Sequence, residues 1–486
     1  MLFHSIEFLV FFPIVVLIFF VMPRKMRTLW LLIASCYFYI SWNPRYAVWI
    51  NVSTIIAYTA GLMIEKSSSV RRKKLVVAFA LLSNLGILAV FKYADFAIET
   101  FNSLCSFAGL GVIEKRLDLL LPLGISFYTF QAAGYIIDVY RGNVPAEKNI
   151  LNFALFVSFF PHLVSGPIER SGSFLKQIRE ISNIHVWDFE RVKDGLMLML
   201  WGIFQKLVIA DRAALLVNQV FANYQNYGFI EIAIAAILFA FQIYCDFGGY
   251  TNTARGAAQV LGFSLAENFR QPYLAVSIKD FWRRWHISLT SWFTDYLYIP
   301  LGGNRKGLIR KYVNIFIVFG VSGLWHGASW HFVAWGLLHA VYQVAGDIKK
   351  RIEEKWHWDG GRETISKRIR KAFTVFVLVD IGWVFFAADS VRHAFCIFRQ
   401  MFTGIIKVSV FELGLDRGNW TTFILAVALL FVIDILHEKG LSVSKIIDSQ
   451  EIWFRYLIYA GLIWSIIMFG IYGIGYDTSQ FIYVQF

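Results

Sequence analysis

The sequence predicts an all-α polytopic membrane protein, and three observations support this fold class. Of the 486 residues, 57% are hydrophobic and only 16% are charged, whereas a typical soluble domain carries about 25% charge. Apolar runs of about 17–25 residues recur from end to end, each long enough to cross a bilayer core of about 30 Å. A membrane β-barrel would show short alternating strands instead. We therefore expect about 10–11 transmembrane helices, plus re-entrant or interfacial helices, in a single membrane domain over residues 1–486.

The charge balance and the cysteines exclude several function classes. Lys and Arg number 46 against 33 acidic residues, a net charge of +13. Such an excess is typical of cytoplasmic loops in membrane proteins and does not imply nucleic acid. The four cysteines are scattered and form no C-x-x-C pair, so the sequence predicts neither a zinc site nor a disulfide framework.

Basic loops give a consistent topology. The first apolar segment, about 8–21, precedes Arg24, Lys25 and Arg27. This order is the reverse of a signal peptide, so we expect a retained helix with its N-terminus outside. Further helices are predicted at about 28–42, 46–64, 75–91, 118–140, 194–220, 229–245, 313–345, 373–388, 421–436 and 456–474. The stretch 150–167 is interpreted as re-entrant and 169–191 as interfacial. Counting crossings places the tail 476–486 outside as well.

One basic and aromatic segment lies between the apolar runs, Asp280-Phe-Trp-Arg-Arg-Trp-His286-Ile-Ser-Leu-Thr290. On a helix that begins after Ser277, His286 falls on the apolar stripe, and Arg283 and Arg284 point away from it. A buried imidazole beside a basic mouth suits chemistry on a group that an anionic carrier such as coenzyme A delivers. Arg283, Arg284 and Trp282 are the candidates for binding that carrier. The alternative is a structural histidine at the interface, with arginines that bind lipid phosphate.

A second histidine, His326, lies in Gly323-Leu-Trp-His326-Gly-Ala-Ser-Trp330. The apolar helix expected at 313–345 is broken by glycine, and it places His326 near the membrane midplane. Ionisable residues at that depth are costly and indicate function. An imidazole is the usual general base for deprotonating a hydroxyl near neutral pH. Gly323 and Gly327 either admit close helix packing or leave room for an acyl group. The alternative is a core histidine bonded to a backbone carbonyl. His331 would face another side of the helix, so no metal site is predicted.

Asp246 is a further candidate. It follows an apolar run in Tyr244-Cys-Asp-Phe-Gly-Gly-Tyr250. The sequence places it at a helix end. An ordinary helix-end or interhelical carboxylate is the alternative to a functional role.

Five ordered motifs give the chain a family resemblance. They are Tyr244-x-Asp246-Phe-x-Gly249-Tyr, Phe281-Trp-Arg-Arg-Trp-His286, Leu297-Tyr-Ile-Pro-Leu-Gly-Gly-Asn304, Gly323-Leu-Trp-His326-Gly-Ala and Gly382-Trp-Val-Phe-Phe386. The chain resembles the membrane-bound O-acyltransferase (MBOAT) family, in the bacterial branch of the alginate O-acetylation protein and the D-alanyl transfer protein of teichoic acid synthesis. The motif-bearing core spans about 120–345. Gly248 departs from the pattern, where serine is commoner.

The resemblance implies a mechanism. It assigns His326 as the catalytic histidine and His286 as a second characteristic polar residue. The implied fold is a ring of helices around a central funnel that joins a cytoplasmic donor side to an outer acceptor side. The donor would be acetyl-CoA or a related acyl thioester, with no permanently bound cofactor. A partner resembling SGNH hydrolases, outside a bacterial cytoplasmic membrane, would then O-acetylate a cell-surface polysaccharide. Membrane lipid is the other expected partner.

The C-terminal tail, Phe481-Ile-Tyr483-Val-Gln-Phe486, resembles the Phe-x-Tyr motif of the small partner peptide in D-alanylation. The resemblance makes Tyr483 a candidate acyl relay, and a frayed interfacial tail is the alternative. Three other functions stay open: D-alanyl transfer to teichoic acid, a transporter with an intramembrane His/Asp relay, and a scaffold for polysaccharide secretion.

Overall fold

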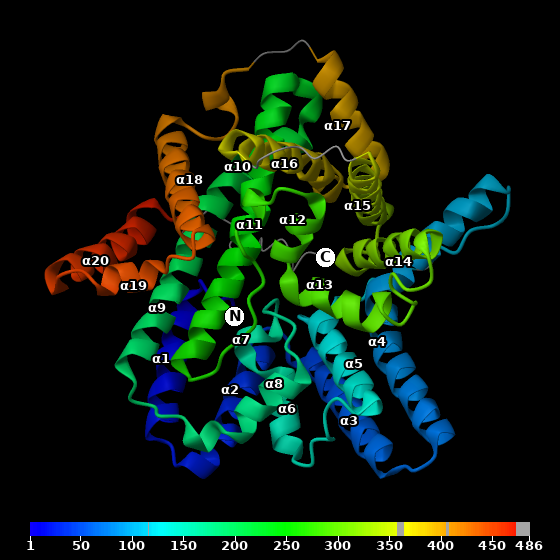
Figure 1. Cartoon of the computed structure of the whole chain (residues 1–486), viewed down its shortest axis with the longest axis vertical. Helices are drawn as coiled ribbons and strands as arrows, with labels where there is room; N and C mark the ends of the chain where they lie inside the picture. The colour runs from blue at the N-terminus through cyan, green and yellow to red at the C-terminus, as the bar shows by residue number, and fades with distance from the viewer. Residues whose placement is uncertain (115, 357–363, 405–407, 473–486) are drawn as a thin grey trace. The chain divides into compact units, whose positions relative to one another are not determined.

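The computed structural model describes residues 1–114, 116–356, 364–404 and 408–472, and every regular element among them is a helix (Figure 1). Six described helices are long and apolar enough to cross a membrane. They are Pro44–Lys66, which includes α3 (Ala47–Lys66), α4 (Val70–Phe107), α11 (Phe229–Val260), α14 (Leu308–His326), α18 (Arg417–Glu438) and α20 (Ile452–Phe469). These findings confirm the all-α membrane fold.

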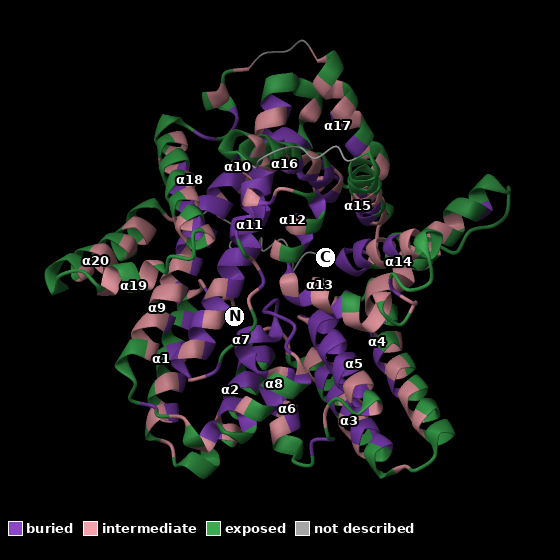
Figure 2. Ribbon diagram, viewed as in Figure 1, coloured by how far each residue is buried: buried purple, intermediate pink, exposed green. Residues whose placement is uncertain are grey.

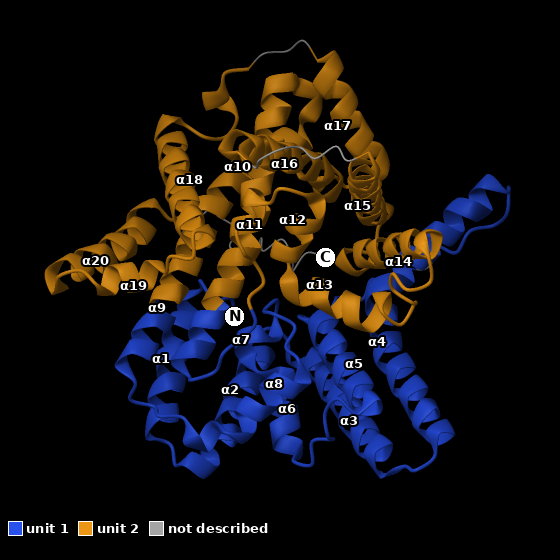
Figure 3. Ribbon diagram, viewed as in Figure 1, with its two compact units in different colours: residues 1–196, 254–266 blue, residues 197–253, 267–486 orange. Residues whose placement is uncertain are grey.

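The described chain divides into two compact units (Figure 3). Unit 1 comprises residues 1–196 and 254–266, and unit 2 comprises residues 197–253 and 267–486. The single membrane domain over 1–486 stays a prediction.

Unit 1 holds the N-terminal helices. Besides α3 and α4 they are α1 (Ile6–Val21), α2 (Arg27–Ile40), α5 (Ile125–Arg141), α6 (Ile150–Ser158), α7 (Phe160–Leu163), α8 (Ser171–Arg179) and the start of α9 (Phe189–Phe204). Helices α3, α4 and α5 pack against one another. The expected helix 75–91 is too short, because α4 runs for 38 residues. Its extension binds the returning chain, since Asp95 Oδ1 accepts from the Leu117 N–H at 2.8 Å and Asn102 Oδ1 from the Ile113 N–H at 2.8 Å.

Unit 2 has an aromatic core. Its further helices are α10 (Asp211–Ala222), α12 (Ile278–Arg284), α13 (Ile287–Phe293), α15 (Trp330–Lys355), α16 (Ile365–Ala387), α17 (Val391–Thr403) and α19 (Val443–Asp448). The side chains of Trp285, Trp335 and Trp383 are at most 1% exposed. Figure 2 shows the buried faces of α11 and α12 in this unit. Large buried aromatic rings supply most of the apolar area that stabilises such a core.

The break that glycine was expected to make in helix 313–345 is confirmed, because the structure has two helices there, α14 and α15, which pack against each other. The chain leaves the helical conformation at Gly327, whose backbone is extended. A Cβ at Gly323 would lie 2.2 Å from the carbonyl oxygen of Phe332, and one at Gly336 would lie 2.2 Å from that of Phe319. Small residues allow this close approach of two helices in a membrane protein. Of the two roles expected for Gly323, the structure shows close packing.

Candidate active site

His286 lies at a break between two short helices of unit 2. The single helix expected beyond Ser277 is therefore wrong, because α12 ends at Arg284 and α13 begins at Ile287. Asn268 causes the break: its carbonyl oxygen accepts from the Ile287 N–H at 2.9 Å, and its Oδ1 accepts from the Ser288 N–H at 3.2 Å. His286 itself has φ 45° and ψ 54°. This left-handed conformation is uncommon outside glycine and concentrates at functional sites.

The break brings the two predicted histidines together. The ring centroids of His286 and His326 lie 6.4 Å apart, with 67° between the ring planes. His286 is 1% exposed and His326 is 3% exposed, so the prediction that His286 is buried is confirmed. His326 is the last residue of α14, directly before the glycine break. The two side chains therefore belong to one buried site.

Aromatic rings enclose this pair. Phe247 of α11 lies 4.7 Å from the His286 ring, centroid to centroid. Trp325 and Trp335 each lie 5.0 Å from the His326 ring, and Phe386 lies 5.5 Å from it. Burial lowers the pKa of His286 to about 3, so this imidazole stays neutral near neutral pH. A neutral His286 suits the orientation of a substrate group better than proton abstraction.

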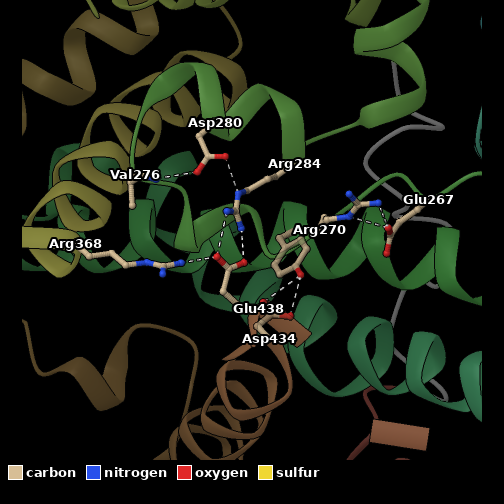
Figure 4. Close-up of polar contacts among 9 residues, drawn as sticks. Glu267, Arg270, Val276, Asp280, Arg284, Arg368, Asp434 and Glu438 are labelled. Atoms are coloured by element: carbon tan, nitrogen blue, oxygen red, sulfur yellow. Dashed lines mark hydrogen bonds and ion pairs between the residues drawn. The ribbon is translucent and has the colours of Figure 1, made fainter. Parts of the chain in front are cut away.

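The residues predicted to bind the donor differ in their surroundings. Arg283 is exposed. The Arg284 guanidinium binds two carboxylates, that of Glu438 at 2.6 and 3.2 Å and that of Asp280 at 3.0 Å (Figure 4). Trp282 is 8% exposed and packs in the core. Arg284 therefore also ties α12 to the end of α18, and Arg368 contacts the same Glu438 carboxylate from α16.

We expect Glu438→Ala to lower the free energy of unfolding by about 1–3 kcal/mol, the usual range for hydrogen bonds to charged groups. The lower end is expected, because the Arg284 and Glu438 side chains keep 17% and 19% exposure. Thermal unfolding in detergent measures the change. Arg368→Ala is the control: its side chain is 52% exposed and should contribute under about 1 kcal/mol. Equal effects of the two substitutions would contradict the anchoring role of Arg284.

Asp246 forms an ion pair with Lys206 of a neighbouring helical segment. The helix end expected there is wrong, since Asp246 lies inside α11. Its Oδ1 lies 2.6 Å from Lys206 Nζ, which also contacts Asp211 Oδ1 at 2.8 Å. Lys206 belongs to a π-helical segment, Gln205–Ala210, and π-bulges often accompany functional sites. The next residue after Asp246 is Phe247, which contacts the His286 ring, so this ion pair holds the helix that packs on the site.

Sequence reasoning missed three site residues. Asn268 and Lys206 carried no motif that marked them. His339 is fully buried and repeats the spacing of His331 and Trp335 along α15; that four-residue spacing places all three on one face and could have identified it. Tyr483 lies outside the described residues.

An integral membrane protein with two buried histidines in an aromatic enclosure is the class that this fold and site define. The sequence profile of the membrane-bound O-acyltransferase family matches residues 144–357. A relative that is 37% identical covers 83% of this chain, and the chain belongs to the membrane-bound O-acyltransferase family. It is therefore an acyltransferase.

Relatives from several bacteria are similar over most of their length. A probable alginate O-acetylase AlgI of Pseudomonas putida is 37% identical over 407 residues, which is 83% of this chain and 80% of the relative. A peptidoglycan O-acetyltransferase of Helicobacter pylori is 33% identical over 81% of this chain and 76% of the relative. A teichoic acid D-alanyltransferase of Bacillus subtilis is 28% identical over 57% of this chain and 71% of the relative. The two O-acetylating relatives thus match more of the chain, and the protein is a membrane O-acetyltransferase.

Proposed function

We propose that this protein takes an acetyl group from acetyl-CoA or a related thioester on the cytoplasmic side and delivers it to an SGNH-hydrolase-like partner outside a bacterial cytoplasmic membrane. That partner then O-acetylates a cell-surface polysaccharide. The pairing of His286 and His326 at 6.4 Å within one aromatic enclosure is the observation that carries the proposal. Relatives that are named for alginate and peptidoglycan support a glycan as the final acceptor.

In this proposal His326 acts as the general base. It accepts the proton of the attacking hydroxyl, the new ester bond forms as the thioester C–S bond breaks, and the proton passes to the departing thiolate. His286, neutral and held at the α12–α13 break, orients the reacting carbonyl or the hydroxyl. The exposed Arg283 is the better placed of the two arginines for the phosphates of the donor, because Arg284 already binds Glu438 and Asp280. Trp282 would complete the donor side.

Reconstitution tests the function directly. The protein is placed in proteoliposomes with acetyl-CoA labelled in the acetyl group, and the label is followed on the protein and on a co-reconstituted partner. Transfer of label supports the proposal. Transfer of a D-alanyl group without acetyl transfer would favour the second candidate, for which the similarity to the D-alanyltransferase speaks. Solute flux without any labelling would indicate a transporter. If neither labelling nor flux were observed, a scaffold would be the remaining function. Protease accessibility of tagged ends tests the proposal that both termini lie outside.

Tyr483→Phe tests the acyl relay. If the Tyr483 phenol carries the acetyl group from the interior to the partner, the variant should lose label on the chain and on the partner. The substitution removes one oxygen and keeps the ring, so membrane insertion should not change. Tyr472→Phe, on another tyrosine near the C-terminal end, is the control and should retain transfer. Full transfer by Tyr483→Phe would reject the relay.

A further inference from the structure

His339 of α15 is a fully buried histidine within the aromatic core of unit 2. Its ring stacks on Phe281 of α12, with centroids 6.3 Å apart and 10° between the planes. Within the part of the chain that the structure describes, neither ring nitrogen has a hydrogen-bond partner. An unsatisfied buried polar group costs free energy, and a phenylalanine ring would fill the same place without that cost. Packing alone therefore does not explain a histidine here.

Two indole N–H groups beside His339 are also buried without a hydrogen-bond partner among the described residues. The Trp282 and Trp335 rings lie 5.0 and 5.2 Å from the His339 ring, centroid to centroid. Among the described residues, neither Nε1 atom has a hydrogen-bond partner. Indole N–H groups only donate, and a neutral imidazole both donates and accepts. Most buried polar groups are hydrogen-bonded, so three unpartnered groups in contact call for a ligand that satisfies them.

Gly382 of α16 lies directly beside the His339 imidazole. A Cβ at Gly382 would lie 3.0 Å from His339 Nε2 and 3.5 Å from Trp335 Cδ1. The absent side chain thus keeps a methyl group from pressing on Nε2, which gives a physical role to the glycine of the Gly382-Trp-Val-Phe-Phe386 motif. We call His339, Trp282, Trp335 and Gly382 the His339 cluster.

The His339 cluster adjoins the histidine pair. The Trp335 ring contacts the His326 ring at 5.0 Å with 87° between the planes, and it contacts His339 from the same helix. One tryptophan therefore links the predicted general base to the unpartnered imidazole. A group bound in the cluster would lie next to the reaction centre and not in an unrelated part of the core.

We propose that His339 is a positioning residue for acyl transfer, and that its cluster binds an oxygen atom that accepts hydrogen bonds from the indole and imidazole N–H groups. That oxygen belongs either to the carbonyl of the acyl donor or to an ordered water molecule that carries the proton during transfer and is not consumed. The shared chemistry is a small uncharged acceptor. The inference rests on the proposed function, since it assigns the cluster to the same reaction as His326.

His339→Phe tests the inference, because it keeps the stacked ring and removes both nitrogens. Transfer from labelled acetyl-CoA in proteoliposomes should fall about tenfold, the value of one lost hydrogen bond. The melting temperature should stay the same or rise. His339→Gln should recover part of the transfer. His393→Phe, on α17 and outside the cluster, is the matched control and should keep transfer within about twofold of the wild type.

The two sources of oxygen give different kinetics. If the donor carbonyl binds, His339→Phe raises the KM for acetyl-CoA. If water binds, KM stays constant while kcat and its solvent deuterium isotope effect change. Unchanged transfer by His339→Phe would overturn the inference and leave the proposed function intact, as would a parallel loss of transfer and stability that His339→Gln does not reverse.

Gly382→Ala provides a second variant should His339→Phe fail to insert. It retains the imidazole and places a methyl group against Nε2, so the same loss of transfer is expected. Unchanged transfer by that variant would also overturn the inference. Absence of transfer by the wild-type protein would remove the proposed function and this inference with it.

Discussion

Replacing His326 with alanine should lower acyl transfer by about 10²–10⁴-fold, the usual contribution of a general base. The imidazole is buried, meets His286 at 6.4 Å and is enclosed by aromatic rings, so bulk water cannot easily replace it as proton acceptor. Transfer of labelled acetyl groups in proteoliposomes measures the loss. Membrane content and melting temperature are recorded in parallel, because truncating a core ring also leaves a cavity.

Two further variants separate chemistry from packing at this position. His326→Gln keeps a hydrogen-bonding side chain of similar size but cannot act as a base, so it should be as inactive as His326→Ala and more stable. His393→Ala removes a half-buried histidine of α17 that contacts Tyr224 and should retain activity. Substantial activity in His326→Gln would remove the general-base role. If His286→Ala alone abolished transfer, the roles assigned to the two histidines would have to be exchanged.

Hydrophobic patterning predicted the fold class because long apolar runs must form helices in a bilayer. The expected spans 421–436 and 456–474 correspond to α18 and α20. The burial of His286 is confirmed, although the single helix on which that prediction rested is broken at this residue. The fold class and the two spans depend on local spacing, which a single sequence records.

The geometry of the site depends on contacts between distant segments, and spacing does not record those. The α12–α13 break arises because Asn268 binds the peptide N–H groups of Ile287 and Ser288. No proline or glycine lies between Trp285 and Thr290, so the sequence contains no helix-breaking residue that would indicate this break. The glycines near His326 indicated a break in helix 313–345, but they did not indicate that the two halves, α14 and α15, pack against each other. Gly327 lies against the Phe332 ring, where a Cβ would be 2.0 Å from Cε2, and only the folded chain reveals that contact.

The ion pair of Lys206 connects helix packing to the site. On α11, Asp246 binds Lys206 while Phe247 contacts His286. The helices meet closely beside this pair, since a Cβ at Gly249 would lie 2.5 Å from the Gly202 carbonyl oxygen. A shift of α11 would therefore move Phe247 along the His286 ring. Stability and site geometry are coupled through these adjacent residues.

Lys206→Met should accordingly destabilise the protein by about 3–5 kcal/mol, the usual cost of removing one partner from a buried ion pair. The Lys206 side chain is 7% exposed and that of Asp246 is 2% exposed, so the remaining carboxylates would lose their cation in a poorly solvated place. Thermal unfolding in detergent measures the change, and transfer should fall with it as α11 loosens.

The matched control for this substitution is Lys349→Met on α15, whose side chain is 77% exposed beside Glu353. This substitution should lower the free energy of unfolding by less than about 1 kcal/mol. The double variant Lys206→Met/Asp246→Asn removes the cation together with the more buried of its two carboxylates and leaves Asp211, whose side chain is 21% exposed. It should regain part of the lost stability, because an uncompensated buried charge accounts for most of the cost. If the double variant were as unstable as the sum of the two single variants, the ion pair would not be the source of the effect. If Lys206→Met were destabilised but fully active, α11 would hold Phe247 against His286 without the Lys206–Asp246 ion pair.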